Sequence, residues 1–229
     1  YKDDKNNWVS PEEIETINGK KYLINDRSKE INVGPSESMS KSKRNTIDPE
    51  KIISNYGADS VRLFILSDSP PEKDVQWSEE GIISSFKFIQ KLWNLNLKFT
   101  KQIEQNYNDD DDQELDKYTN IFLKKITDNL DHFSYNKMIA NLHEMYSSLF
   151  KQIDKKYTKK TLISNYEKIL IAINPIIPHF SNECLERLKI STENIKWPLI
   201  EQKYLEQEIF NIVTQINGKK RKVFSINKT

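Results

Sequence analysis

The segment Ser38–Lys43, with the sequence SMSKSK, brings together groups that bind phosphate. It carries hydroxyl groups, backbone N–H groups and two lysines just before an expected helix N-terminus, an arrangement suited to a polyphosphate. Lys41 would be the point charge. A lysine near phosphates contributes most when negative charge moves onto a leaving pyrophosphate, because binding that strengthens in the transition state raises the rate. By composition alone, a solvated loop or a phosphorylation target is the favoured interpretation.

The residues around this segment predict a loop followed by two short helices. Gly34–Asn45 has no hydrophobic periodicity and therefore predicts a surface loop. Asp48–Glu50, with the sequence DPE, supplies an N-cap, a proline at the first helical position and a first-turn acid. That helix is expected to end near Tyr56, with Gly57 as its C′ residue. A second short helix is expected over Asp59–Leu66, before two prolines that halt it.

Two short apolar runs upstream of the loop predict a β-hairpin. They are Lys21–Ile24 and Glu30–Val33, and the polar residues Asn25–Lys29 separate them as a longer loop. We interpret residues 1–33 as the end of a catalytic or connecting region that begins further upstream.

From Ser78 onward, the apolar residues recur with the period of long amphipathic helices. One helix is expected from Ser78 to about Ile103, and three more over about 115–130, 138–153 and 162–173. Four long helices joined by short polar loops predict an up-and-down bundle.

Prolines change the pattern after the fourth long helix. Pro175 and Pro178 interrupt it, a short helix is expected over Asn182–Leu188, and Trp197-Pro198 opens an extended segment. The bundle region is therefore expected to cover 78–198.

The strongest hairpin pattern lies near the end of the sequence. Two β-rich runs, Glu208–Ile216 and Lys219–Ile226, flank Asn217-Gly218, a dipeptide typical of a type I′ turn. A hairpin alone is only marginally stable, so we expect 203–229 to be the truncated start of a small α+β C-terminal domain.

The composition favours a helical protein and argues against several other classes. The 229 residues include 35 Lys+Arg and 34 Asp+Glu, so the net charge of +1 does not identify a partner. Five glycines are few for a Gly-rich dinucleotide fold, and one cysteine with three isolated histidines argues against a metal site. The sequence contains no apolar run long enough for a membrane span and no signal-peptide pattern, so we expect a cytoplasmic protein without a membrane partner.

The stretch Gly34–Trp77 closely resembles the class I aminoacyl-tRNA synthetases around their KMSKS signature, where MSKSxxN, a D-P helix start and YGAD-x-x-R recur in this order. Within that class it looks like the leucyl-tRNA synthetases of the bacterial type, because the continuation SPPEKDVQWSEEG is similar to theirs. The helical region, with INPIIPHF, resembles their anticodon-binding-type bundle, and VTQINGKKRK resembles the opening of their C-terminal domain. The resemblance covers essentially the whole chain.

This resemblance implies a mainly α fold and a part in the ATP-dependent attachment of leucine to tRNA(Leu) through leucyl-adenylate. It assigns 34–77 to the KMSKS loop and stem-contact helices, and it makes Lys41 the catalytic residue that contacts the ATP phosphates. Mg²⁺ is expected with ATP in the full-length enzyme. The implied ATP-binding residues are Ser38, Met39, Ser40, Lys41 and Ser42. The basic residues that we expect to contact tRNA are Lys43, Arg44, Lys219, Lys220, Arg221 and Lys222.

The sequence departs from the family pattern in two ways. Ser38 occupies the place of the first KMSKS lysine, so one charge contact is lost. The HIGH signature and the leucine pocket of the family would lie upstream, so we expect leucine to bind through another domain and the chain alone to be inactive. Two other functions stay open: a non-catalytic tRNA-binding module or split subunit, and a helical protein-interaction domain.

Four further features favour structural or solvent-exposed roles, and a fifth is open. We interpret His179 as a buried, hydrogen-bonded histidine, Cys184 as an inert buried thiol, and Arg62 as an ion-pair partner at a helix junction. The acidic run Asp109–Asp112 is expected to be a solvated loop, because it would repel phosphate. The basic run Lys219–Lys222 fits an RNA-backbone patch and a merely soluble turn equally well.

Overall fold

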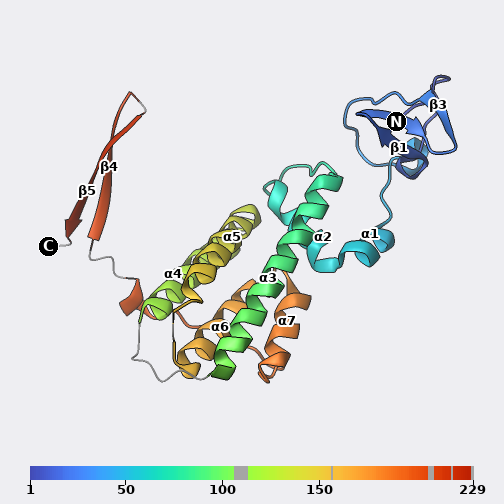
Figure 1. The fold of residues 1–229 in the computed structure, drawn as a ribbon. Helices are drawn as coiled ribbons and strands as arrows, with labels where there is room; N and C mark the ends of the chain where they lie inside the picture. The colour runs from blue at the N-terminus through green and yellow to red at the C-terminus, as the bar shows by residue number, and fades with distance from the viewer. Residues whose placement is uncertain (106–112, 156, 206–208, 218, 228–229) are drawn as a thin grey trace.

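The computed structural model describes residues 1–105, 113–155, 157–205, 209–217 and 219–227, and Figure 1 shows their fold. Within these residues a three-stranded sheet is followed by seven α-helices and a two-stranded hairpin. The helices are α1 (Pro49–Tyr56), α2 (Ala58–Asp68), α3 (Glu79–Gln105), α4 (Glu114–Asp131), α5 (Tyr135–Gln152), α6 (Lys159–Ile173) and α7 (Pro178–Arg187). The strands are β1 (Ile14–Ile17), β2 (Lys20–Leu23), β3 (Asp26–Glu30), β4 (Ile209–Ile216) and β5 (Lys219–Asn227). Short 3₁₀ helices cover Pro11–Glu13, Lys41–Lys43 and Gln202–Tyr204. The mainly α fold class is confirmed.

The N-terminal sheet differs in part from the expected hairpin. Strand β2 pairs antiparallel with β3, but β3 lies mostly in the residues that the sequence assigned to the loop, and only Glu30 of the expected run Glu30–Val33 belongs to it. The expected hairpin also omitted β1, which pairs antiparallel with β2. Asn18 and Gly19 join β1 to β2 with φ angles of 51° and 80°. Positive φ at both positions is what a type I′ turn requires, so this Asn-Gly dipeptide was the local signal for the missed hairpin.

The two short helices after the loop begin and end where local signals place them. The Asp48 carboxylate caps α1 by accepting a hydrogen bond of 3.0 Å from the N–H of Glu50. At the other end, Gly57 has a φ of 79°, and its N–H donates to the carbonyl of Ile53 at 2.8 Å. Positive φ favours glycine here, and α2 starts at the next residue. The prediction for both helices is confirmed.

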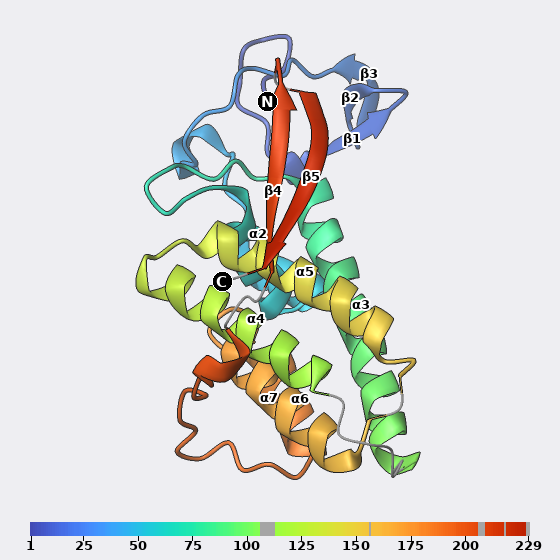
Figure 2. The same cartoon turned by 90° about the vertical axis from the view of Figure 1, so that its left-hand side faces the viewer.

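Helices α3 to α7 form the expected bundle, which Figure 2 shows from the side. The longest, α3, has 27 residues and runs along one side of it. The apolar faces meet in one core, and side chains at its centre include Leu92, Ile126, Leu142, Leu162 and Leu170, each at most 2% exposed. Burying such side chains is the main favourable contribution to the stability of the bundle.

The segment after α7 returns to the bundle without forming a helix or strand before Gln202. The indole N–H of Trp197 donates to the hydroxyl of Thr127 at 3.0 Å, and the N–H of Glu201 donates to the side-chain oxygen of Asn120 at 2.8 Å. Both acceptors belong to α4. These bonds hold the extended segment against α4, and the prediction that Trp197 opens an extended segment is confirmed.

Helix α7 begins earlier than expected, at Pro178 rather than near Asn182. A proline inside an apolar pattern predicts a helix break, but a proline is well tolerated at the first helical position because that N–H has no intrahelical partner. Pro178 therefore starts α7, and only the connection around Pro175 separates α6 from α7.

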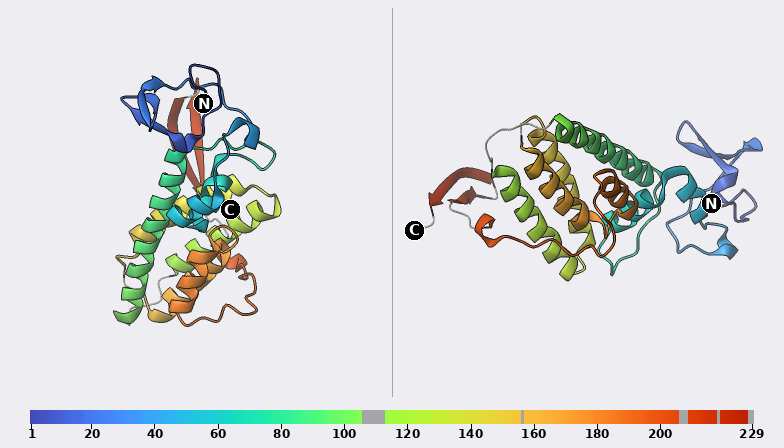
Figure 3. Two further views of the ribbon diagram at one scale, coloured as in Figure 1. Left: turned by 90° about the vertical axis from the view of Figure 1, so that its right-hand side faces the viewer. Right: turned by 90° about the horizontal axis from the view of Figure 1, so that it is seen from below.

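The hairpin β4–β5 and the N-terminal sheet lie on opposite sides of the bundle in Figure 1 and in the right panel of Figure 3. Asn217 has a φ of 52°, as the expected turn requires, while its partner Gly218 lies outside the described residues. The acidic run 109–112 also lies outside them. Among the described helices, none combines the length and apolar character needed to cross a membrane.

Candidate functional site

The residues 38–45, which we call the signature loop, are held in shape by Asn45. The Asn45 side-chain oxygen accepts a hydrogen bond of 2.7 Å from the N–H of Ser40, and its amide nitrogen donates to the carbonyl of Ser38 at 3.3 Å. Lys41–Lys43 forms a single 3₁₀ turn inside this clamp, and Arg44 ends the turn in the left-handed conformation with a φ of 48°. A short polar loop thus gains a defined shape from one side chain of its own sequence.

Lys41 is the unpaired cation of the loop. Its side chain is exposed, and no residue in the described part of the chain makes an ion pair or hydrogen bond with its ammonium group. The Ser40 and Ser42 hydroxyl oxygens lie 2.7 Å apart beside it, and Ser42 is exposed. This turn therefore presents a positive charge and hydroxyl groups together, as binding a polyphosphate requires.

The two other basic residues of the loop are engaged in ion pairs. Lys43 pairs with Glu37, and Arg44 bonds to the Glu13 carboxylate at 3.0 Å and to the Trp8 carbonyl at 3.4 Å. The hydrogen bond from Lys43 lowers the pKa of Glu37. The pKa of Glu13 is lowered chiefly by the N–H of Ser10 and further by Arg44. The loop is therefore fastened to the N-terminal sheet region through Arg44.

The remaining expected site residues lie in two places. Ser38 and Met39 are exposed at the start of the signature loop, with Met39 half exposed at 50%. The basic run Lys219–Lys222 lies on β5, and its four side chains are exposed. In Figure 1, β5 and the signature loop lie on opposite sides of the bundle. The structure therefore does not join the two basic groups into one site.

A second cluster joins α2 to the corner between α6 and α7. The buried Asp59 carboxylate accepts hydrogen bonds from the backbone N–H groups of His179 at 3.3 Å and Phe180 at 2.6 Å. Arg62 donates to the carbonyls of Pro175 at 2.6 Å and Ile176 at 3.0 Å. Asp59 thus caps the N-terminus of α7 from another helix, and Arg62 satisfies carbonyl groups just beyond α6.

These contacts correct two interpretations. The His179 side chain is exposed rather than buried, and only its backbone N–H takes part in the cluster. Arg62 does act at a helix junction, but its partners are backbone carbonyls rather than an acid. Cys184 is buried as expected, and its burial raises the pKa of the thiol to about 12.

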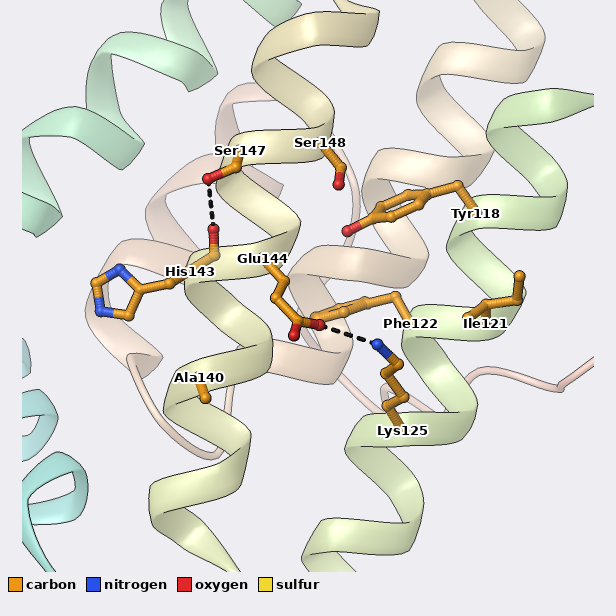
Figure 4. A pocket seen from close by; sticks show the side chains of 9 residues that line it. All are labelled: Tyr118, Ile121, Phe122, Lys125, Ala140, His143, Glu144, Ser147 and Ser148. Carbon is orange, nitrogen blue, oxygen red and sulfur yellow. Dashed lines mark hydrogen bonds and ion pairs between the residues drawn. The ribbon is translucent and has the colours of Figure 1, made fainter. Parts of the chain in front are cut away.

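Helices α4 and α5 enclose a shallow groove of about 580 Å³, drawn in Figure 4. Lys125 of α4 and Glu144 of α5 form an ion pair across it at 2.9 Å, and the Tyr118 hydroxyl points toward Ser148. Burial raises the pKa of Tyr118. Lys41 is not part of the lining of this groove, and the Ser147 hydroxyl within it donates to the backbone carbonyl of His143 at 3.0 Å. No group of three or more His, Cys, Asp or Glu side chains that could hold a metal occurs in the part of the chain that the structure describes.

Asn45 and Asp59 have structural roles that the sequence alone does not predict. Both belong to the motifs MSKSxxN and YGAD, so the motifs themselves were the only available signal. Their structural partners could not be read from the pattern, and for Asp59 the partner Phe180 lies 121 residues away.

Two family models match the chain. The anticodon-binding domain of tRNA ligases matches residues 112–229, and the class I tRNA synthetases for I, L, M and V match residues 33–78. Among curated relatives, the leucine–tRNA ligase of Orientia tsutsugamushi (strain Boryong) is 40% identical over 232 residues, which cover 98% of this chain and 27% of the relative. That of Rickettsia massiliae (strain Mtu5) is 34% identical over 227 residues, with the same two coverages.

Solved structures with a similar fold include a tRNA complex of a relative. It is the LeuRS of Agrobacterium radiobacter K84 in a ternary complex with tRNA and LeuAMS, with a TM-score of 0.69 and 20% sequence identity. The match covers 82% of this chain and 25% of that chain. The chain thus spans about a quarter of the length of the proteins that it matches.

Proposed function

The chain belongs to the leucyl-tRNA synthetase family, and from that membership we propose that it supplies the ATP-phosphate contact and the tRNA-docking surface of a leucine–tRNA ligase. The reaction is the ATP-dependent attachment of leucine to tRNA(Leu) through leucyl-adenylate. The observation that carries the proposal is the exposed and unpaired Lys41 at the centre of a loop whose other two cations are engaged in ion pairs.

Lys41 acts on the phosphates of ATP. A free ammonium group in a clamped loop can approach the β- and γ-phosphates without first breaking an internal ion pair. Its attraction grows as negative charge collects on the departing pyrophosphate, so it lowers the barrier more than it tightens ground-state binding. The hydroxyls of Ser40 and Ser42 and the exposed residues Ser38 and Met39 complete the contact surface. Mg²⁺ is the counterion expected to accompany ATP.

Different parts of the chain are proposed to bind the nucleotide and the tRNA. We assign 34–77 to the nucleotide-binding loop with its two short helices, 78–198 to the tRNA-docking bundle and 203–229 to the start of a further tRNA-binding domain, with 1–33 as the connecting region before the loop. The match of an anticodon-binding domain model to residues 112–229 supports a tRNA partner for the second half. The basic residues Lys43, Arg44 and Lys219–Lys222 are the proposed phosphate contacts of these parts.

A chimera tests the proposal. The 229 residues replace the matching segment of the Orientia tsutsugamushi enzyme, to which they are 40% identical, and charging of tRNA(Leu) with radioactive leucine is measured. We expect an active chimera. A chimera that folds and binds tRNA but forms no adenylate would favour the non-catalytic tRNA-binding module instead.

A further inference from the structure

One face of α3 carries a row of lysines that no proposed contact has used. Lys87, Lys91, Asn94, Lys98 and Lys101 follow one another at intervals of three or four residues, and all five side chains are exposed. At 100° per residue these positions fall within about 40° of one line along the helix. We call the four lysines the α3 lysine row. At 1.5 Å per residue, the row is about 21 Å long.

Unlike Lys124 and Lys125 of α4, the α3 lysine row has no acidic partners among the described residues. Lys124 pairs with Asp128 at 2.5 Å and Lys125 with Glu144 at 2.9 Å, whereas none of the row lysines has an ion-pair partner within the described ranges. Between Glu80 and Glu104, α3 has no acidic residue at all.

The like charges of the row lower the intrinsic stability of α3 as a helix. Lys87 and Lys91 are like charges at i,i+4, and Lys98 and Lys101 at i,i+3, and each such pair costs a few tenths of a kcal/mol in a helix. If the charged face served only solubility, acidic residues between the lysines would stabilise the helix through ion pairs, as Asp128 does with Lys124 in α4. A row of positive charge without acids is instead complementary to a polyanion.

Helix α5 fixes one edge of the α3 lysine row. The ammonium of Lys98 lies 4.1 Å from the ring centroid of Phe150, and the rings of Phe88 and His143, tilted by 33° to each other, have centroids 3.8 Å apart. Lys91 lies near enough to His143 to lower its pKa, although burial is the larger cause. These aromatic contacts thus join α5 to the helix that carries the row, and they hold the Lys98 ammonium over the Phe150 ring of α5.

We propose that the α3 lysine row binds the phosphate backbone of RNA, and that in this chain it is a phosphate-tracking surface for the tRNA. The inference rests on the proposed function for the choice of RNA as the polyanion. Lysines bind phosphates as point charges and read no bases, so the row contributes affinity and orientation without sequence preference. The exposed amide of Asn94 adds a hydrogen-bond donor between the two lysine pairs.

The test compares two fourfold variants of the 229-residue chain by filter binding to a tRNA(Leu) transcript over a range of salt concentrations. The row variant carries Lys87→Gln, Lys91→Gln, Lys98→Gln and Lys101→Gln. The control variant loses the same charge at paired lysines, with Lys20→Gln, Lys51→Gln, Lys124→Gln and Lys203→Gln. We expect the row variant to bind at least about tenfold more weakly, with a salt slope smaller by about one unit for each lost phosphate contact. The control should change by less than about threefold.

A measurement on the unmodified chain gives an independent readout. Lysines are labelled with an amine-reactive ester with and without tRNA, and the sites are identified by mass spectrometry. The row lysines should be protected, and Lys20 and Lys51 should not.

Three results would overturn the inference, and they are distinguishable. If the chain binds tRNA but the two variants weaken equally and the row is unprotected, the row proposal fails while the proposed function stands. If the unmodified chain does not bind tRNA at all, the proposed tRNA-docking function fails with it. If polyglutamate displaces tRNA as well as RNA of equal charge does, the row recognises acidic polypeptides rather than RNA.

Discussion

The carboxylate of Asp59 caps a helix to which it does not belong. Its oxygen accepts a hydrogen bond of 2.6 Å from the N–H of Phe180, the third residue of α7, although 121 residues separate the two in sequence. The N-cap position itself is occupied by Ile177, whose side chain cannot accept a hydrogen bond. Asp59 therefore joins α2, the second short helix after the signature loop, to the N-terminus of α7 in the bundle.

The first prediction concerns the stability of this junction. Asp59→Ala leaves the N–H groups of His179 and Phe180 without their buried acceptor, and we expect it to lower the free energy of unfolding by about 2–3 kcal/mol. Asp59→Asn keeps one acceptor oxygen and should lose less. Urea denaturation followed by circular dichroism measures both variants. The exposed Asp68→Ala, at the end of α2, is the control and should change stability by less than about 0.5 kcal/mol. Equal effects of Asp59→Ala and Asp68→Ala would show that the capping contact contributes nothing.

The second prediction concerns the reactivity of Cys184. Its thiol is buried and its pKa is raised to about 12 by that burial, so almost no thiolate is present near neutral pH. We expect the folded chain to react with Ellman's reagent at pH 8 far more slowly than the chain in urea, where one thiol should be titrated. Rapid labelling of the folded chain would contradict the burial of this residue.

The third prediction concerns His143, whose pKa is lowered by burial and further by the charge of Lys91. Lys91→Gln removes the second cause and should raise the pKa of His143, whereas the distant Lys20→Gln should leave it unchanged. The pH titration of the His143 ring proton by NMR measures the shift.

The sign of the effect of His143 on stability follows from the same shift. Because the pKa is lowered on folding, the neutral ring is favoured in the folded chain. The stability that the neutral His143 ring contributes to the folded chain is therefore present at a pH above 6.5, the ordinary pKa of histidine. It is lost as the pH falls below that value. If the contribution of His143 to the free energy of unfolding increased as the pH fell from 6.5 to 5, the lowered pKa of His143 would be contradicted.

Elements with local signals could be predicted from the sequence. The start of α1 follows from Asp48 and Pro49, its end follows from Gly57, and the long period after Ser78 predicts α3. The predicted position of the first hairpin is wrong because it rests on the apolar run ending at Val33, whereas the turn lies at Asn18-Gly19.

Features that depend on distant partners could not be predicted. His179 follows a proline in an apolar stretch, which predicts a buried side chain. In the structure its neighbours Ile177 and Phe180 are buried, but the His179 side chain is exposed. Arg62 was placed correctly at a junction, while its acceptors lie on carbonyls more than a hundred residues away. Likewise, the motif alone does not reveal that Lys41 is unpaired while Lys43 and Arg44 have acidic partners.

The fourth prediction concerns the basic run on β5. The net charge of +1 gives the chain no overall attraction for RNA, so affinity must come from local basic surface. Changing Lys219, Lys220, Arg221 and Lys222 together to Ser should weaken tRNA binding clearly and reduce its dependence on salt. We expect the unmodified chain to bind at about micromolar affinity or weaker at physiological salt, with little preference for tRNA(Leu). Tight and salt-insensitive binding, measured by gel shift, would contradict a mechanism based on phosphate contacts.

The most direct test of the central claim, that Lys41 contacts the ATP phosphates, is leucine-dependent exchange of pyrophosphate into ATP by the chimera with and without Lys41→Ala. The account predicts that this variant lowers the exchange rate by about thirtyfold to a thousandfold, or about 2–4 kcal/mol of transition-state stabilisation, while the KM for leucine stays nearly unchanged. Lys51→Ala, which removes an exposed lysine paired with Glu12, should leave the rate unaltered, and Ser38→Lys should be neutral or mildly activating. An exchange rate that is unchanged in Lys41→Ala, or lowered equally by Lys51→Ala, would contradict the role assigned to the signature loop.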